Sequence, residues 1–189
     1  MGKYLIFFMA FFFVGAQVVA QNKENKWVVG ASIGMVKFST EDAKVVGDQF
    51  VFQIPKLNVA RYFTNGITVD AGFSIGAINK IPGMFSNSLD YLSIDLGATY
   101  DFGLANENLV PYLYGGASFI SANSEMTPTM NFGGGATFWL NPRYGVNLQL
   151  LYKSAKTTTV SMRSHTYFSV GVVYSLKLRT LVPRLWSHN

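Results

Sequence analysis

The chain has 189 residues, and only 13% of them are charged, where a soluble domain carries about 25%. Hydrophobic residues make up 49% of the sequence and the mean hydropathy is +0.22, so the strong apolarity of a helical membrane bundle is missing as well. The sequence contains no Cys, which excludes disulfides, thiol catalysis and Cys-based zinc sites.

Residues 1–20 predict a signal peptide. They combine an early positive charge at Lys3, an apolar run over 5–16 and small side chains towards Ala20. The run is shorter than the roughly 20 residues of a membrane-spanning helix, although an uncleaved anchor is the alternative. The polar residues 21–26 predict a flexible lead-in, and no later apolar stretch has the length of a spanning helix.

The rest of the chain alternates apolar with small polar residues at a period of two, which is typical of β-strands. The eight predicted strands are 27–37, 49–63, 67–77, 92–102, 110–120, 130–140, 144–153 and 168–178. An even number of strands is what closure of a bacterial barrel requires. The pattern leaves the facing of 110–120 open, and Pro55 predicts a bulge that shifts the register of the second strand.

The connections between these strands alternate in length. Short links fall at 64–66, 103–109 and 141–143, and the first of them contains Asn65-Gly66, the strongest hairpin dipeptide. The longer connections are 38–48, 79–88, 121–129 and 154–163. In an outer-membrane barrel the short turns face the periplasm, so this alternation predicts that both termini are periplasmic.

The polar faces of the strands decide whether the apolar faces meet lipid or a bound ligand. In a soluble lipocalin-like carrier the polar face meets water and should be rich in Lys, Glu and Asp, whereas here it is mostly Gly, Ser, Thr and Asn. The apolar face extends over about 9–11 residues, which is enough for a tilted strand to cross a bilayer. We therefore predict an all-β, eight-stranded antiparallel up-and-down transmembrane β-barrel over 27–178, with the soluble carrier of an apolar ligand as the alternative.

Three segments carry a resemblance to a known family. They are Ile54–Gly66, Val110–Gly116, and Asn131–Asn141 running into Gly145–Lys153. These segments resemble small Gram-negative outer-membrane barrels like the transmembrane domain of the outer-membrane protein A type. The resemblance implies insertion by the barrel-assembly machinery, contact with outer-membrane lipids and lipopolysaccharide, and a structural or small-pore role.

The end of the sequence departs from that family. Such barrels usually end on an aromatic residue that the assembly machinery reads, whereas here the eighth predicted strand stops near Leu178 and 179–189 follow as a periplasmic tail. Relatives often continue into a peptidoglycan-binding domain. The tail is too short to form one, so anchoring to the cell wall is not expected.

If the apolar faces point outward, five charged side chains enter the lumen. They are Asp70, Asp95, Asp101, Lys153 and Lys177. Counted from the short turns, Asp95 and Lys153 lie at a similar height, and the other three lie nearer the periplasmic end. Because an isolated buried charge costs several kcal/mol, we predict two layers of compensated charge. They form either a polar plug or a constriction for small ions, and the narrow bore of an eight-stranded barrel favours the plug.

No catalytic, metal or cofactor site is predicted. His165 is expected to be solvated at the outer rim and His188 lies in the tail, so two distant histidines without a dense carboxylate cluster do not suit a metal. Ser164 is poorly aimed at His165, because neighbours in a strand point to opposite faces. The run 133–135 of glycines indicates close approach of strands rather than a phosphate loop, since no helix follows it.

The remaining features concern the surface. Basic residues are scattered singly despite a net charge of +5, which argues against nucleic acid as a partner. Arg61 shares a face with Leu57 and Val59 and is expected to snorkel towards lipid headgroups. The loop tips at 41–44, 81–85 and 157–159 would face outside, where an extracellular ligand could bind.

We predict a non-enzymatic outer-membrane protein with a structural or surface-interaction role and a mostly plugged lumen; a small ion-conducting pore is the alternative.

Overall fold

Eight strands and one short helix make up the computed structural model, which describes residues 27–46, 49–76, 91–102, 107–122, 125–155, 163–179 and 181. In chain order the elements are β1 (Trp27–Lys37), α2 (Thr40–Val46), β2 (Phe50–Thr64), β3 (Ile67–Ile75), β4 (Tyr91–Asp101), β5 (Leu109–Ala122), β6 (Glu125–Trp139), β7 (Tyr144–Ala155) and β8 (His165–Ser175). The predicted signal peptide (1–20), the lead-in (21–26) and most of the tail lie outside the described residues.

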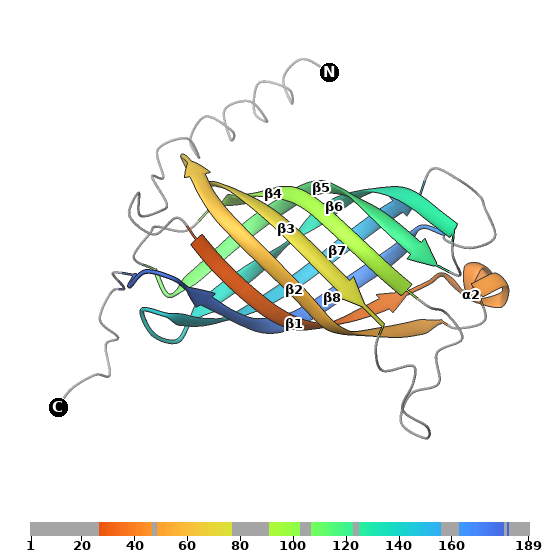
Figure 1. Ribbon diagram of the computed structural model, residues 1–189, viewed down its shortest axis with the longest axis horizontal. Coiled ribbons are helices and arrows are strands. Elements are labelled where there is room, and N and C mark those ends of the chain that lie inside the picture. The colour runs from red at the N-terminus through yellow and green to blue at the C-terminus, as the bar shows by residue number, and fades with distance from the viewer. Residues whose placement is uncertain are drawn as a thin grey trace, which may run out of the picture.

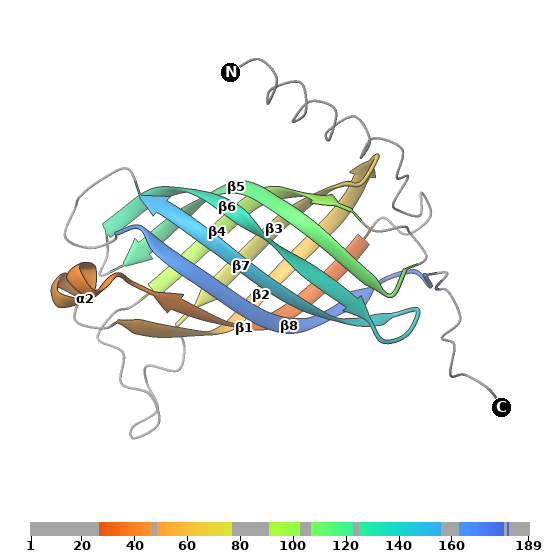
Figure 2. The same cartoon turned by 180° about the vertical axis from the view of Figure 1, so that it is seen from behind.

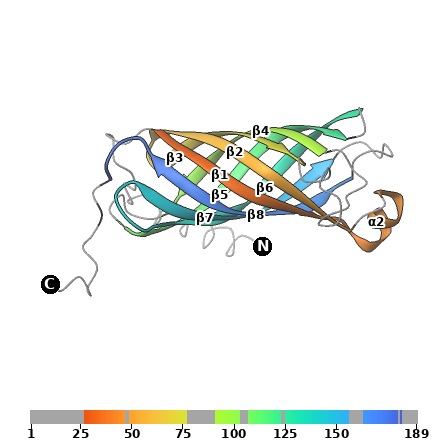
Figure 3. The ribbon, with the colours of Figure 1, turned by 60° about the horizontal axis from the view of Figure 1, so that its bottom comes forward.

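Each strand pairs antiparallel with the next one in the chain, and β8 pairs with β1, so the sheet closes into a barrel. Figures 1 and 2 show the two sides of the wall, and Figure 3 shows the tilt of the strands across the barrel. The helix α2 lies at one end, called here the α2 end, and the start of β1 and the end of β8 lie at the other, called the turn end. The predicted eight-stranded antiparallel up-and-down architecture is confirmed.

The period-two alternation separates the two faces of the wall as predicted. Large apolar side chains such as Leu96 and Val172 are exposed on the outside, whereas Asp95 and Ser169 are buried on the inside. The structure also settles the facing of β5, which the sequence left open. The inward side chains Tyr112, Tyr114, Ser118 and Ile120 are buried, and the residues between them, such as Leu113 and Phe119, are exposed on the outside.

The short turns follow from their residues. Asn65 and Gly66 both have positive φ, +45° and +81°, which is the conformation of a type I′ hairpin turn. In the turn between β6 and β7, the side-chain Oδ1 of Asn141 accepts hydrogen bonds from the backbone N–H groups of Arg143 at 2.8 Å and Tyr144 at 2.7 Å. Each of these turns joins its two strands at the turn end with only a few residues.

The predicted bulge at Pro55 is confirmed. Ser32 of β1 pairs with Lys56 of β2, but Gly34, two residues further on, pairs with Gln53, three residues back along β2. The extra residue of β2 therefore lies at Ile54-Pro55.

Some element boundaries differ from the prediction. The segment 121–129, predicted as a connection, instead continues the strands, because β5 runs to Ala122 and β6 starts at Glu125 with these two residues paired. Strand β8 lies three residues earlier than predicted, because its neighbours β7 and β1 offer partners only from His165 to Ser175. The helix α2 lies in the predicted connection 38–48 and starts after Ser39, whose hydroxyl accepts a hydrogen bond from Asp42 N at 3.1 Å.

Among the described residues, no helix has both the length and the apolarity to cross a membrane.

Candidate functional site in the barrel lumen

Lys153 of β7 and Asp95 of β4 form an ion pair in the middle of the lumen. Lys153 Nζ lies 2.6 Å from Asp95 Oδ1, and the two side chains are 0% and 5% exposed. Ser93 donates a hydrogen bond to the same Oδ1 at 2.8 Å and accepts one from Lys153 Nζ at 3.1 Å. The structure thus brings together the two residues that the sequence placed at a similar height, and each buried charge depends on the other for compensation.

Lys56 of β2 is a further buried cation, which the five predicted lumen charges omit. Its Nζ donates to Gln149 Oε1 at 2.9 Å. The Nζ atoms of Lys56 and Lys153 lie 4.8 Å and 5.0 Å from the centre of the Tyr167 ring, so two amines share one aromatic side chain. A signal for Lys56 existed in the sequence, because the alternation that turns Leu57 outward turns its neighbour inward.

Asp70 and Asp101 face the half of the lumen towards the turn end, as predicted from their strand faces. Asp70 Oδ2 accepts a hydrogen bond from Asn58 Nδ2 at 2.8 Å, and Asp101 Oδ2 accepts one from Thr68 Oγ1 at 3.3 Å. The structure does not place either carboxylate in the ion pair of Asp95. Each acid thus accepts a hydrogen bond from a neutral polar side chain of the adjacent strand.

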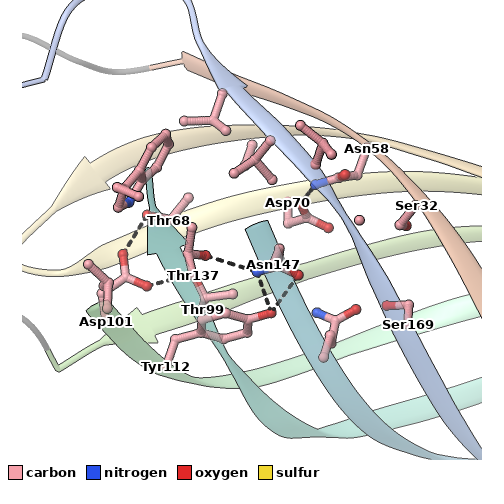
Figure 4. Close-up of a pocket in the computed structure, with 18 of the residues that line it drawn as sticks. Ser32, Asn58, Thr68, Asp70, Thr99, Asp101, Tyr112, Thr137, Asn147 and Ser169 are labelled. Carbon is pink, nitrogen blue, oxygen red and sulfur yellow. Dashed lines mark hydrogen bonds between the residues drawn. The ribbon is translucent and has the colours of Figure 1, made fainter. Parts of the chain in front are cut away.

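A cavity of about 100 Å³ occupies this half of the lumen. Its polar lining includes Asn58, Asp70, Asp101, Tyr112 and Asn147, which point into the same space in Figure 4. Asn147 Nδ2 donates to Thr137 Oγ1 at 2.9 Å and to the Tyr112 hydroxyl at 3.0 Å. The volume corresponds to roughly three water molecules at liquid density. The lining can therefore hold a few waters or a hydrated ion but no large ligand.

Lys177 does not enter the lumen, so its place among the predicted lumen charges is wrong. Its side chain is exposed and follows the end of β8. The chain leaves the sheet after Ser175, whose hydroxyl donates to Lys177 O at 2.7 Å. The alternation of faces applies only to paired residues of a strand. The pairing of β8 ends at Ser175, two residues before Lys177, so the alternation does not predict where Lys177 lies.

Arg179 supplies the cation at the turn end instead. It is 4% exposed, its backbone N–H donates to Pro142 O at 2.9 Å, and its guanidinium carbon lies 4.2 Å from the centre of the Trp139 ring. Burial lowers the pKa of Arg179 to about 10, and the Asp101 carboxylate opposes this shift. The sequence assigned this residue to a tail, yet it lines the cavity and remains charged at neutral pH.

The inner face of the described barrel therefore carries balanced charge. Three cations and three carboxylates line it: Lys56, Lys153, Arg179, Asp70, Asp95 and Asp101. Since the low-dielectric interior penalises net charge, this balance lets the polar core form inside a narrow barrel.

Apolar clusters of buried side chains lie on both sides of this polar core. At the turn end Val110, Trp139 and Val173 pack together, with Leu181 against them. At the α2 end the buried cluster includes Val36, Phe38, Val51, Tyr91, Ile120 and Tyr167. Ala43 of α2 packs on this second cluster, and Arg163 Nη1 lies 3.2 Å from Asp42 Oδ1, which links the start of β8 to the helix.

His165 is buried, so the expectation of a solvated histidine at the rim is wrong. It is 1% exposed, with its ring centre 5.3 Å from that of Phe38 and its Nε2 3.4 Å from the Tyr91 hydroxyl. The reason is that β8 starts at this residue and Phe38, just beyond β1, folds over it. The neighbouring Ser164 Oγ accepts a hydrogen bond from Ala155 N at 3.0 Å, which directs it to the backbone of β7.

Across the described ranges, no three His, Cys, Asp or Glu side chains are grouped so that they could hold a metal ion.

Solved structures with the same architecture include outer-membrane barrels. The N-terminal β-barrel domain of Pseudomonas aeruginosa OprF matches with a TM-score of 0.60 at 13% identity, covering 80% of this chain and 98% of that one. Neisserial surface protein A matches with a TM-score of 0.59 at 14% identity, covering 81% and 98%. The outer membrane protein OprG from Pseudomonas aeruginosa matches with 0.53 at 11% identity, covering 84% and 99%.

Comparisons of the sequence, in contrast, gave no match. No protein-family model matches the chain. No curated protein sequence matches it either. The class defined by the structure is thus the fold of the small eight-stranded outer-membrane barrels, which this chain shares with proteins of very different sequence.

Proposed function

We propose that this chain is an integral outer-membrane protein without catalytic activity, with a structural or surface-interaction role and a closed lumen. The observation that carries the proposal is the contrast between the two faces of the wall: apolar side chains cover the outside, and balanced charges between two apolar clusters fill the inside. In this arrangement both termini are periplasmic and α2 faces the exterior of the cell.

The outside of the wall supports a lipid environment. Leu96, Leu113 and Leu150 are more than half exposed on three different strands, and they belong to a belt that surrounds the barrel. Soluble monomers rarely expose contiguous apolar patches larger than a few hundred Å². Aromatic residues such as Trp27 and Tyr144 lie at the turn end of this belt, where amphipathic rings favour a membrane interface.

The same facing argues against the soluble carrier. A lipocalin-like barrel binds an apolar ligand because its apolar face points inward. Here the inward side chains in the middle of the barrel include Lys56, Asp95 and Lys153, and the lining of the cavity of about 100 Å³ includes the charged Asp70, Asp101 and Arg179. These charged groups do not suit an apolar ligand.

Several parts of the proposal rest on the sequence. Residues 1–20 would direct export, and the barrel-assembly machinery would insert the chain among outer-membrane lipids and lipopolysaccharide. A surface ligand would bind the loops of the α2 end. The segment 41–44 lies in α2, whereas the loop tips at 81–85 and 157–159 lie outside the described residues.

Cell fractionation followed by gel electrophoresis tests the membrane location. The full chain is expected in the outer-membrane fraction, and after detergent extraction its unboiled band should migrate faster than the boiled one, because a closed barrel resists the detergent. A soluble periplasmic band without a heat shift would contradict the proposal and favour the carrier.

A small ion-conducting pore is the second candidate function, and the polar cavity in the turn-end half favours it. An ion entering this cavity would meet Asp70 and Asp101 and then the layer of Lys56, Asp95 and Lys153. Single-channel recording of the folded protein in planar bilayers separates the two functions. A closed lumen gives no discrete current steps, whereas a pore gives steps that Lys56→Met alters and the surface control Lys37→Met does not.

A further inference from the structure

Three cations lie on one side of the rim at the turn end, on the outside of the barrel. Arg61 is near the end of β2, Arg143 precedes β7 and Lys177 follows β8, and all three side chains are exposed. They lie on or next to β2, β7 and β8, which together with β1 are four consecutive strands of the closed sheet. We call this part of the rim the basic arc.

The other described residues of this rim differ in charge from the basic arc. In the two short links on that side, the described residues 64–66 and 107–109 include no Lys or Arg, and Glu107 is acidic. Among the described residues of this rim, the basic arc is therefore a one-sided feature rather than part of an even girdle.

Two of the cations are held on aromatic rings at the membrane-facing surface. The guanidinium carbon of Arg61 lies 5.1 Å from the centre of the Trp27 ring, and Trp27 is 44% exposed. Arg143 Nη1 donates to the Tyr174 hydroxyl at 2.6 Å, and its guanidinium carbon lies 5.9 Å from the centre of that ring. A guanidinium has five N–H donors, so each retains donors for another ligand.

Within the described part of the chain, none of the three cations forms an ion pair. The ion pairs of Lys153 with Asp95 and of Arg163 with Asp42 lie elsewhere, in the lumen and at the α2 end. The positive charge of the basic arc is thus not compensated by the neighbouring wall.

Strand pairing fixes the spacing of the two arginines. Trp27 of β1 pairs with Arg61, and on the other side Leu176 N donates to Trp27 O at 3.1 Å while Ser175 N donates to Arg143 O at 2.8 Å. Three strand spacings separate β2 from β7, which places the two backbones roughly 14 Å apart. The seam of β8 and β1 lies between them, with the apolar Leu176 exposed at the rim.

We propose that the basic arc binds the headgroups of anionic glycerophospholipids in the periplasmic leaflet, an inference that rests on the proposed membrane location. A guanidinium donates two parallel hydrogen bonds to a phosphate, and the ring beneath each arginine holds it at headgroup depth. A zwitterionic headgroup carries an ammonium or choline cation that three uncompensated positive charges repel. An anionic headgroup is therefore preferred.

Trp27 provides a local reporter for the test. The full chain carrying Trp186→Phe is refolded into phosphatidylcholine vesicles with an equal share of either brominated phosphatidylglycerol or brominated phosphatidylcholine, and tryptophan fluorescence is recorded. Trp139 is buried in the lumen and is shielded from lipid bromine, so quenching reports lipid beside Trp27. We expect stronger quenching by the brominated phosphatidylglycerol.

Substitutions test whether this preference for the anionic lipid depends on the basic arc. Arg61→Gln/Arg143→Gln/Lys177→Gln should quench equally with both lipids, and Arg61→Lys/Arg143→Lys should retain part of the preference. Lys37→Gln is the matched control, because Lys37 also lies over an exposed ring, 5.9 Å from the centre of Phe50, but at the α2 end. It should keep the full preference.

The outcomes distinguish a failure of the lipid site from a failure of the proposed membrane location. Equal quenching by both lipids in the parent chain, or a preference that persists in the triple Gln variant, overturns the lipid site while the heat-shifted band still supports the membrane barrel. A chain that shows no heat shift and is quenched by neither lipid overturns the proposed function and the lipid site together.

Discussion

Leu148 and Gln149 are neighbours in β7, yet they lie on opposite faces of the wall and in different environments. Leu148 is 47% exposed and belongs to the apolar belt, whereas Gln149 is buried and accepts a hydrogen bond from Lys56 across the lumen. The outward position requires only that its side chain be apolar. The inward position requires a particular partner on a strand that is distant in sequence.

This difference means that the two faces respond to different kinds of substitution. A lipid-facing residue exchanges freely with other apolar residues, because hydrocarbon contacts are not directional. An inward residue has no such freedom, because its partner keeps a buried charge or hydrogen-bonding group when the residue is replaced.

The largest expected effect comes from breaking the central ion pair on the inner face. Lys153→Met leaves Asp95 buried without its cation, which is expected to lower the free energy of unfolding by about 3–5 kcal/mol. Urea unfolding of the protein in lipid vesicles measures this loss. The double variant Asp95→Asn/Lys153→Met should recover a large part of it, and equal losses in the single and double variants would contradict the role of the pair.

A charge on the outer face should cost somewhat less. Leu148→Arg places a guanidinium near the bilayer midplane and is expected to cost about 2–4 kcal/mol. The matched control is Leu176→Arg at the turn-end rim, where the cost falls to about 0–1 kcal/mol. Vesicle flotation and urea unfolding compare the two variants. If Leu148→Arg inserts and folds as well as Leu176→Arg, the assignment of this face to lipid is wrong.

Two glycines extend the comparison to close packing. A Cβ atom on Gly133 of β6 would collide with the backbone oxygen of Leu150 on β7, whereas one on Gly115 of β5 would meet no atom within 4 Å. Gly133→Ala is therefore expected to cost about 1–3 kcal/mol. Gly115→Ala should stay within about 0.5 kcal/mol of the parent. Urea midpoints of the two variants measure the difference, and equal midpoints would show that the wall adapts to the added methyl group.

The smallest effect is expected where an ion pair is accessible to water. Arg163 and Asp42 at the α2 end are one-third and one-fifth exposed, so the solvent screens their attraction. Asp42→Asn should cost about 0.2–1 kcal/mol, and added salt should reduce the difference. Unfolding at low and high salt checks this value. A loss as large as that of Lys153→Met would mean that the α2 end is closed more tightly than the exposure of the pair implies.

The sequence by itself determined the architecture of the barrel. Period-two alternation indicates which residues face outward, the count of strands and links follows from the breaks in that alternation, and Asn65-Gly66 and Pro55 identified a turn and a bulge. These features are local, because each depends on the conformation of a few consecutive residues. The inward direction of Asp70, Asp95, Asp101 and Lys153 follows from the same alternation.

Only the tertiary structure decided where the strands end and which inward groups meet. The end of β8 depends on the partners that β1 and β7 offer, so the exposure of Lys177, the burial of Arg179 and the burial of His165 could not be obtained from one strand alone. The pairing of Lys153 with Asp95 joins residues 58 positions apart in sequence, across the lumen. Closure of the sheet is the physical reason, because it sets the distances across the barrel that no local pattern contains.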